Sequence, residues 1–471
     1  MLFPTVEFAI FFGLVFALSW ACAGFPQLRK LVLVVASFIF YGWWDYRFVF
    51  LLFNCTMANY IFGLLLERYD QDKPRRTIAT IAVIFNLGVL AYFKYTGFFL
   101  SSLNDLLNTL GLEQAVKVAE VILPVGVSFY TFQGISYVVD IYQRRMKAVE
   151  SPLDMLLFKS FFPQLVAGPI VRASDFLPQL SKTPSQLRAT RALLLIAFGL
   201  LKKVVLANYL ATDLVNPVFS SPKTHSTIDL ILAAYGYAVQ IYCDFSAYTD
   251  MAIGVALLFG YEFPTNFNQP YRAASLQDFW RRWHMSLSAF LKDYLYIPLG
   301  GSRGSRTKTY RNLMLTMILG GLWHGAAWTF VIWGALHGAG LCVERALQQR
   351  KAIILQSRQT RWLKPFQILF TFHYVCLAWI FFNAESLSSA LSYLRSLGNT
   401  DIQAKYLTPF SLFLIGCGLM TQFLKSDLLD RIEARAMQIP LPLQATAMAL
   451  VVVVVTALSP GSLAPFIYFR F

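Results

Sequence analysis

The segment LTMILGGLWHGAAWTFVIWGALHG, Leu315 to Gly338, is almost wholly apolar, yet it contains His324 and His337, each followed by a glycine. The chain has only five histidines. A run this long and this apolar is typical of a segment that enters a lipid bilayer. Ionisable side chains at membrane depth are costly and rare, so two histidines within the segment are candidates for a functional role.

The whole chain has the composition of an integral membrane protein. Of its 471 residues, 57% are hydrophobic and 14% are charged, whereas about a quarter of the residues in soluble domains are charged. Apolar segments of roughly the length that crosses a bilayer recur along the chain. We predict an all-α polytopic membrane protein with about 11 transmembrane helices, plus re-entrant and interfacial helices around a central tunnel. Residues 1–471 are predicted to form one integral-membrane domain that keeps its first apolar segment.

The distribution of basic residues predicts the orientation of the chain. The segment Tyr271–Arg311 has eight basic and two acidic residues, and Glu344–Lys364 has six basic residues and one acidic residue. Because Lys and Arg accumulate in cytoplasmic loops, both segments are predicted to be cytoplasmic, and Asn216–Thr227, with one Lys, is predicted to be external. This rule also explains the net charge of +15, and no motif indicates nucleic-acid binding.

The same orientation makes a prediction for the histidine-rich segment. If both flanks are cytoplasmic, Asn312–Val343 must enter and leave the membrane by one face, although two full crossings need about 40 residues. We therefore predict a re-entrant or broken pair that bends near Gly320–Gly321 or Gly325, with one long tilted helix as the alternative. His324 would lie at the bend, where the glycines would leave space for another molecule and Trp323 and Trp328 would form walls.

The two histidines are not expected to act together. His337 lies 13 positions after His324, which corresponds to about 220° around an ideal helix, so the rings would face different directions. His337 is therefore interpreted as structural. For His324 the alternatives are a catalytic imidazole and a neutral ring that is hydrogen-bonded to a helix carbonyl.

A second group of polar and aromatic residues precedes this segment. Trp280, Trp283, Leu287 and Leu291 fall at i, i+3, i+7 and i+11, which predicts an amphipathic helix at the cytoplasmic interface, with His284 beside the apolar stripe. The sequence GGSRGSR, residues 300–306, is either a flexible loop that holds an anion such as phosphate or an ordinary cytoplasmic loop.

Other polar residues and the cysteines give weaker indications. Asp244 and Asp250 lie in or near a span, where they either cap and pack a helix or, for Asp244, orient a histidine. The six cysteines lie in apolar segments without CxxC spacing. They are interpreted as buried thiols, with no metal site.

Two long stretches resemble a known family. NFNQPYRAASLQDFWRRWHMSLSAFLKDYLYIPLGG and RNLMLTMILGGLWHGAAWTFVIWGALHG are similar to sequences of the membrane-bound O-acyltransferases. The similarity is nearest to the bacterial branch that includes the alginate O-acetylation protein and its cellulose-acetylating and teichoic-acid D-alanylating relatives. FPQLVAGPIVR and YFKYTGFF are also similar, so the resemblance covers nearly the whole chain.

The resemblance implies an enzyme of the bacterial inner membrane that moves an acetyl group from cytoplasmic acetyl-CoA to an exported polysaccharide. It implies no bound cofactor, and a periplasmic polysaccharide O-acetyltransferase as partner. The family's catalytic histidine matches His324 in LWHG, and its second histidine matches His284 in RRWH, where it would position the donor near the cytoplasmic face. Further candidates are the donor-binding residues Arg281, Arg282, Trp283, Arg303 and Arg306 and the supporting residues Asp244 and Trp323.

The tail PFIYFRF, residues 465–471, resembles a motif of the same branch and is predicted to be external. The resemblance makes Tyr468 a candidate acyl relay, whereas an aromatic anchor at the membrane interface is the alternative. For the whole protein, the alternatives are a secondary transporter or flippase that uses its histidines for proton coupling, and an O-acyltransferase that acts on lipids or proteins. No internal repeat supports the transporter.

Overall fold

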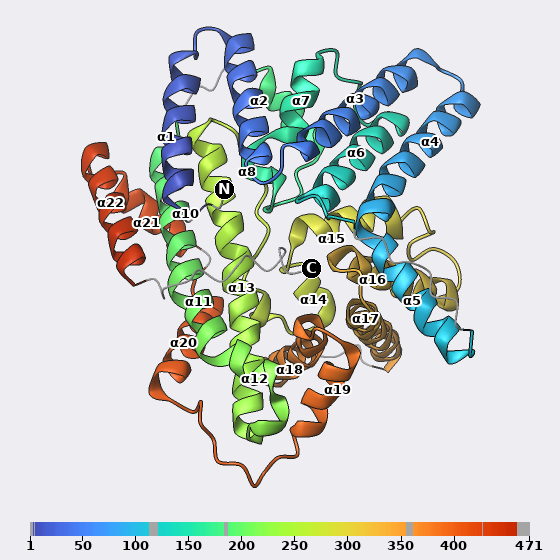
Figure 1. Cartoon of the computed structure of the whole chain (residues 1–471), viewed down its shortest axis with the longest axis vertical. Helices are drawn as coiled ribbons and strands as arrows, with labels where there is room; N and C mark the ends of the chain where they lie inside the picture. The colour runs from blue at the N-terminus through green and yellow to red at the C-terminus, as the bar shows by residue number, and fades with distance from the viewer. Residues whose placement is uncertain are drawn as a thin grey trace. The chain divides into compact units, whose positions relative to one another are not determined.

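The structure is a computed structural model that describes residues 3, 5–112, 121–182, 187–354, 361–425 and 427–458. These residues form helices joined by short connections, without a β-strand among them (Figure 1). The prediction of an all-α protein is confirmed. The contacts divide the chain into two compact units, so its organisation as one domain stays a prediction.

The first unit consists of residues 1–192 and 252–264. Its helices are α1 (Val6–Ala21), α2 (Pro26–Gly42), α3 (Arg47–Arg68), α4 (Asp72–Leu90), α5 (Thr96–Thr109), α6 (Val127–Tyr142), α7 (Pro152–Ser160), α8 (Phe162–Leu165) and α9 (Ala173–Leu180). Helices α3, α4 and α6 pack together. Buried Asn59 of α3 and Asn86 of α4 exchange side-chain hydrogen bonds of 2.8 and 3.1 Å next to Gly134 of α6. The paired amides satisfy each other in an apolar setting, where an unpaired amide would be costly.

The second unit consists of residues 193–251 and 265–471. Its helices are α10 (Ala189–Leu201), α11 (Asn208–Leu210), α12 (Asn216–Ser220), α13 (Thr227–Leu258), α14 (Leu276–Trp280), α15 (Met285–Leu291), α16 (Arg306–His324), α17 (Trp328–Ile354), α18 (Lys364–Asn383), α19 (Leu387–Ser396), α20 (Pro409–Met420), α21 (Leu428–Ala436) and α22 (Leu441–Ala457). Short 3₁₀ or π segments lie at 202–207, 211–215, 222–224, 270–272, 292–296, 361–363 and 421–423. A few residues at the start of α10 and the end of α13 belong to the first unit.

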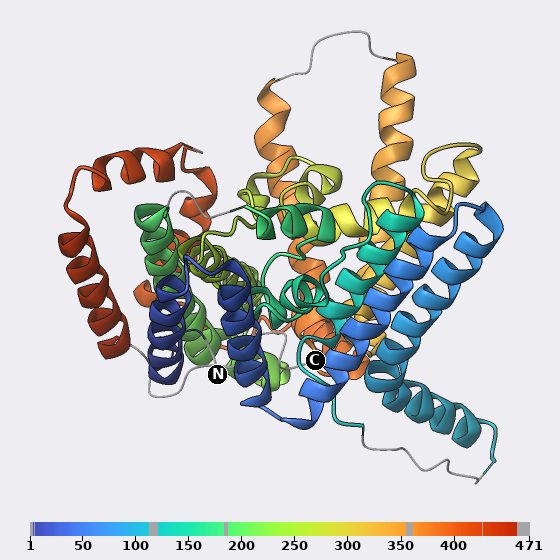
Figure 2. The same cartoon turned by 90° about the horizontal axis from the view of Figure 1, so that it is seen from above.

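Six helices within the described residues are long and apolar enough to cross a membrane, or seven if a bent pair is one span. They confirm a polytopic membrane protein, whereas the predicted number of about eleven crossings stays a prediction. Two of these helices, α17 and α18, are consecutive and pack against each other, and Figure 2 shows both in orange with their upper ends apart. The described cysteines are free and buried or half-buried.

Helices α16 and α17 form the antiparallel hairpin predicted from the charge distribution. The break between them follows His324 and includes Gly325, so the bend lies at one of the two predicted places. The arms are longer than the apolar segment, with 19 and 27 residues, because the charged flanks continue the helices. At 1.5 Å per residue, α16 is about 28 Å long, close to the thickness of a bilayer core.

Neighbouring atoms fill the space beside the glycines of this hairpin. The prediction that these glycines leave room for another molecule beside His324 is therefore wrong. A Cβ on Gly321 would overlap the carbonyl oxygen of Phe330, and a Cβ on Gly325 would overlap the ring of Phe330. A Cβ on Gly334 would overlap the Met317 carbonyl oxygen and lie 2.9 Å from the Ile318 Cα. Small residues permit such close approach of helices in membranes.

We expect Gly334→Ala to destabilise the protein by about 1–3 kcal/mol, because the added methyl group meets backbone atoms that cannot rotate away. Gly416→Ala in α20 is the matched control, since a Cβ there meets nothing within 4 Å. Thermal unfolding of both variants in detergent tests this. Equal melting temperatures for the two variants would show that the hairpin is not closely packed at Gly334.

The amphipathic helix predicted over Trp280–Leu291 is interrupted, so this prediction is wrong. Helix α14 ends at Trp280, α15 begins at Met285, and His284 between them has a left-handed backbone, with φ of 43°. Trp283, Leu287 and Leu291 are buried. The stripe therefore packs inside the protein and does not form an exposed apolar face.

Candidate active site

His324 ends α16 and lies inside a cage of aromatic rings. It is 3% exposed, and its ring centroid lies 5.1 Å from that of Trp323, 5.2 Å from Trp333 and 5.3 Å from Phe382. Trp323 is thus a wall residue, as predicted. Trp328 is 56% exposed, and its predicted place is taken by Trp333 of α17 and Phe382 of α18.

His284 lies beside His324, although 40 residues separate them in the sequence. The two ring centroids are 6.2 Å apart, and His284 is fully buried. The depth of His284 relative to the membrane faces stays a prediction. A left-handed backbone costs energy in a non-glycine residue, and such conformations often occur at functional sites. Here it turns the chain so that the imidazole points inward.

The hydrogen bonds around His284 define its tautomer. Asn266 Oδ1 accepts hydrogen bonds from the Ser286 backbone N–H at 3.1 Å and from the Ser286 hydroxyl at 2.8 Å. The backbone N–H can only donate, so this side-chain atom of Asn266 is the amide oxygen. His284 Nδ1 lies 3.2 Å from the same oxygen and must therefore carry the proton. Nε2 then presents a lone pair, and it has no hydrogen-bond partner within the described part of the chain.

His284 lies outside the candidate spans, and burial lowers the pKa of its imidazole to about 3. Burial disfavours the charged ring, so the neutral form dominates at neutral pH. The ring is therefore a neutral imidazole with a fixed tautomer, and its Nε2 lone pair can accept a hydrogen bond from a hydroxyl group.

His337 belongs to the aromatic core, as predicted from its position. Its ring stacks on Phe279 at 6.1 Å with an interplanar angle of 10°, and its other ring neighbours include Trp280 at 5.1 Å and Trp333 at 4.8 Å. The ring is fully buried. Its neighbours are therefore those of a packing residue.

The predicted donor-binding residues have different surroundings. Arg281, Arg303 and Arg306 are exposed. Arg282 Nε pairs with Asp278 Oδ1 at 2.8 Å. Trp283 is 2% exposed and lies 5.0 Å from Trp379 and 5.6 Å from Phe279 between ring centroids. The structure places Trp283 in the core beneath the histidines, while the roles of the arginines stay predictions.

Asp244 and Asp250 each form an ion pair on α13. The Asp244 carboxylate lies 2.7 Å from Lys203 Nζ, and the Asp250 carboxylate lies 2.6 Å from Lys202 Nζ. These lysines come from the π-helical segment that follows α10. The pairs hold α13 to that segment, which is the packing role considered for both aspartates. Tyr468 lies outside the described residues.

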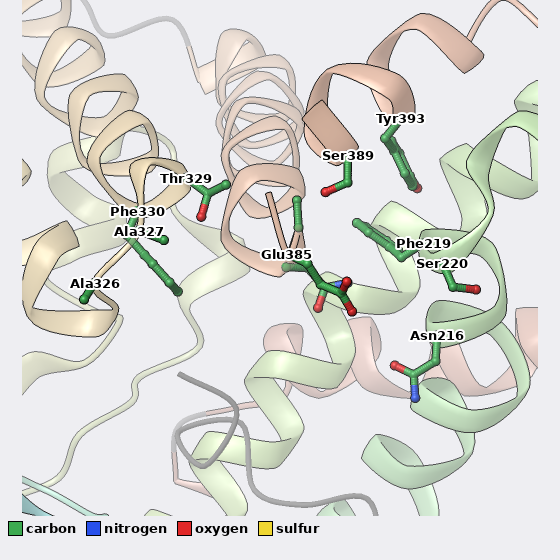
Figure 3. Close-up of a pocket in the computed structure, with 12 residues that line it drawn as sticks. Asn216, Phe219, Ser220, Ala326, Ala327, Thr329, Phe330, Glu385, Ser389 and Tyr393 are labelled. Atoms are coloured by element: carbon green, nitrogen blue, oxygen red, sulfur yellow. The ribbon is translucent and has the colours of Figure 1, made fainter. Parts of the chain in front are cut away.

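A cavity of about 780 Å³ opens at the bend of the hairpin (Figure 3). Its walls come from the bend, from α12, α17 and α19, and from the end of α18 with the connection to α19. They comprise Asn216, Phe219, Ser220, Ala326, Ala327, Thr329, Phe330, Asn383, Ala384, Glu385, Ser389 and Tyr393. The buried Thr329 hydroxyl has no partner within the described residues. Phe330 lines the cavity, its ring lies 5.0 Å from that of Phe382, and the Phe382 ring lies 5.3 Å from that of His324 between centroids.

The sequence indicated the two histidines but not the groups that hold them. Asn266, Trp333, Phe382 and the cavity residues have no motif of their own. The contact of Asn266 with His284 depends on the left-handed turn, which the predicted continuous helix did not allow.

Two buried imidazoles therefore lie side by side in a polytopic helical protein, near a cavity at the bend of the hairpin, and they are candidates for acid–base chemistry at membrane depth. Residues 146–384 match the MBOAT family, the membrane-bound O-acyltransferases. The chain belongs to this family and is an O-acyltransferase. Membership of this family favours the O-acyltransferase over the alternative of a secondary transporter or flippase.

Several curated relatives are similar over most of the chain. The probable alginate O-acetylase AlgI of Pseudomonas aeruginosa is 41% identical over 83% of this chain and 73% of its own length. The peptidoglycan O-acetyltransferase of Helicobacter pylori is 39% identical over 79% of this chain and 74% of its own length. The teichoic acid D-alanyltransferase of Bacillus subtilis is 30% identical over 55% of this chain and 68% of its own length.

Proposed function

We propose that this enzyme moves an acetyl group from cytoplasmic acetyl-CoA across the bacterial inner membrane for the O-acetylation of an exported polysaccharide. The observation that carries the proposal is the pair of buried rings, His284 and His324, beside a cavity at one end of the hairpin. Relatives named for alginate and peptidoglycan acetylation favour a polysaccharide over a lipid or protein acceptor.

The chemistry requires one base and a dry site. An acceptor hydroxyl oxygen attacks the thioester carbonyl carbon, and an imidazole takes the hydroxyl proton. The tetrahedral intermediate then collapses, the C–S bond breaks, and the sulfur of coenzyme A leaves and takes up a proton. His324 acts either as this base or, where His284 accepts the proton, as a transient carrier of the acetyl group. The aromatic cage around His324 excludes water and so limits wasteful hydrolysis of the thioester.

The hairpin separates a donor side from an acceptor side. Arg303 and Arg306 lie at the start of α16, and the cavity lies beyond its other end, about 28 Å away along the helix. We assign the basic end to the cytoplasm by the positive-inside rule. The acetyl-CoA phosphates would then approach the arginines, and the acceptor would approach through the cavity. A periplasmic acetyltransferase is the expected recipient on that side.

The direct test is transfer of radiolabelled acetyl from acetyl-CoA by the purified protein in proteoliposomes, with the acceptor on the opposite side. Labelled product on that side supports the proposal. Uptake of an acceptor without any release of coenzyme A would contradict it.

We expect the double variant Arg303→Gln/Arg306→Gln to raise the KM for acetyl-CoA about tenfold, because two charges that attract the phosphates are removed. Both residues are exposed, so the melting temperature should not change. Lys405→Gln, another exposed basic residue, is the control. The KM is measured from thiol release at low and high salt. An unchanged KM at low salt would remove these arginines from the donor site.

A further inference from the structure

Thr329 is a buried threonine whose hydroxyl group makes no hydrogen bond within the described part of the protein. It is 1% exposed and lines the cavity at the bend of the hairpin (Figure 3). Its Oγ1 atom has no partner among the described residues. A buried hydroxyl group without a partner costs free energy. Such a group in the wall of a cavity is therefore a candidate for binding a ligand.

The position of Thr329 in α17 explains why its hydroxyl group has no partner. Three other buried threonines, Thr56, Thr316 and Thr371, donate to the carbonyl oxygen four residues earlier, at 2.6, 2.7 and 2.8 Å. Thr329 is the second residue of α17. Four residues earlier lies Gly325, which is outside the helix and has an extended backbone, with φ of −156° and ψ of 148°. Thr329 therefore lacks the carbonyl partner that a position deeper in a helix would supply.

The backbone of Thr329 offers a second donor. The first N–H groups of a helix have no partner within that helix. The Phe330 and Val331 N–H groups donate to the Ala327 carbonyl oxygen at 3.1 and 3.4 Å. The Thr329 N–H makes no hydrogen bond within the described chain, and the dipole of this 27-residue helix adds partial positive charge at the same place. The hydroxyl, the N–H and the dipole together are suited to an oxygen atom that carries negative charge.

The register of the hairpin places Thr329 level with His324. A Cβ on Gly321 would overlap the Phe330 carbonyl oxygen and would lie 3.3 Å from the Gly334 Cα. Because the arms are antiparallel, three steps toward the bend on α16 correspond to three steps toward the bend on α17. The first three-residue step leads from Gly321 to His324, and the second leads into the first turn of α17, which contains Thr329.

Thr329 also shares the face of α17 that contacts His324. Thr329 and Trp333 are four residues apart and therefore lie on one face of the helix. The Trp333 ring lies 5.2 Å from the His324 ring between centroids. Side chains of a helix lean toward its N-terminus, so the Trp333 ring lies toward the turn that contains Thr329. The two donors of Thr329 are thus on the side of α17 where the proposed reaction takes place.

We infer that Thr329 binds the carbonyl oxygen of the acetyl group beside His324. Its hydroxyl and its backbone N–H both donate to this oxygen. When the attacking atom bonds to the carbonyl carbon, an electron pair of the C=O bond moves to the oxygen, and the two donors stabilise the negative charge. The pair returns as the bond from the carbonyl carbon to the leaving group breaks, and Thr329 keeps its proton throughout. This inference rests on the proposed function and adds a group that the histidines do not supply, because an imidazole that accepts the hydroxyl proton does not stabilise the new oxyanion.

Thr329→Val is the direct test, because it removes the hydroxyl group and keeps nearly the same shape. We expect kcat for acetyl transfer to fall about 10- to 100-fold with the KM for acetyl-CoA unchanged, somewhat less than the loss of a single strong donor, because the N–H remains. The melting temperature should stay the same or rise, since an unpartnered buried hydroxyl is replaced by a methyl group. Thr329→Ser keeps the hydroxyl and should keep most of the activity. Thr316→Val on the other arm is the matched control, because its hydroxyl only donates to the Asn312 carbonyl oxygen, and its kcat should match the wild type.

A spectroscopic measurement separates this inference from the proposed function. In His324→Ala, where transfer is slow, the infrared carbonyl stretch of bound isotope-labelled acetyl-CoA should move to higher frequency when Thr329→Val is added, because the carbonyl loses a hydrogen bond. An unchanged stretch or an unchanged kcat in Thr329→Val would overturn the inference, while release of coenzyme A by the wild type would still support the proposed function. An equal loss of activity in Thr329→Ser and Thr329→Val, with lowered melting temperatures, would also overturn it. A shifted stretch without any release of coenzyme A by the wild type would support the inference on binding and overturn the proposed function, and the absence of both would overturn the two together.

Discussion

His324→Ala should reduce acetyl transfer from acetyl-CoA by about 10²–10⁴-fold, with little loss of folded protein. A positioned base contributes about this factor to proton transfer, and a covalent carrier would contribute at least as much. The alanine leaves a small hole within the cage of Trp323, Trp333 and Phe382, in which the Trp333 and Phe382 rings stay in contact with each other. The measurement is release of coenzyme A together with radiolabel in the acceptor.

His337→Phe is the matched control for this variant. His337 is the other histidine of the hairpin, and a phenyl ring keeps its stacking on Phe279 and its edge-to-face contact with Trp333. We expect transfer by this variant to stay near the wild-type rate. If His337→Phe lost as much activity as His324→Ala, the effect would reflect damage to the aromatic core and the assignment of His324 would fail.

The hairpin is the part of the fold that the sequence predicts well. Two basic flanks required a return to the same face, and the glycines near His324 marked the bend, so the position of α16 and α17 follows from charge and local propensity. How closely the chain packs beside those glycines could not be predicted from charge and local propensity. Whether Gly321 leaves a space or admits the Phe330 carbonyl depends on how closely a second helix approaches.

The candidate site was predicted in its residues but not in its geometry. Spacing along a continuous helix placed His284 beside an exposed stripe, whereas the left-handed turn at that residue sends its ring inward to within 6.2 Å of His324. A single residue with a left-handed backbone changes the direction of the chain that follows it. Helical periodicity in the sequence does not predict such a break. The contact between Asn266 and His284 has the same origin, because it needs the turn to exist.

His284→Ala should lower the rate of transfer by about 10²–10³-fold if its Nε2 lone pair accepts the proton. Asn266 is a positioning residue, because it acts through the tautomer of His284. Asn266→Ala should therefore lower kcat while leaving the KM for acetyl-CoA unchanged. Asn268→Ala, an exposed amide two residues away, is the control, and its kinetics should match the wild type.

Asn266→Asp gives a readout that a purely structural role would not produce. The new carboxylate still accepts the Nδ1 proton, but its charge favours the imidazolium form and raises the pKa of His284 from its burial-lowered value of about 3. A base is lost when it is protonated, so activity of this variant should fall as the pH decreases through the raised pKa. In the wild type, the His284 imidazole should stay neutral over the same pH range, so activity should not decrease there. If the pH profiles of the two proteins coincide while their rates differ, Asn266 only supports the fold, and His284 is not the base.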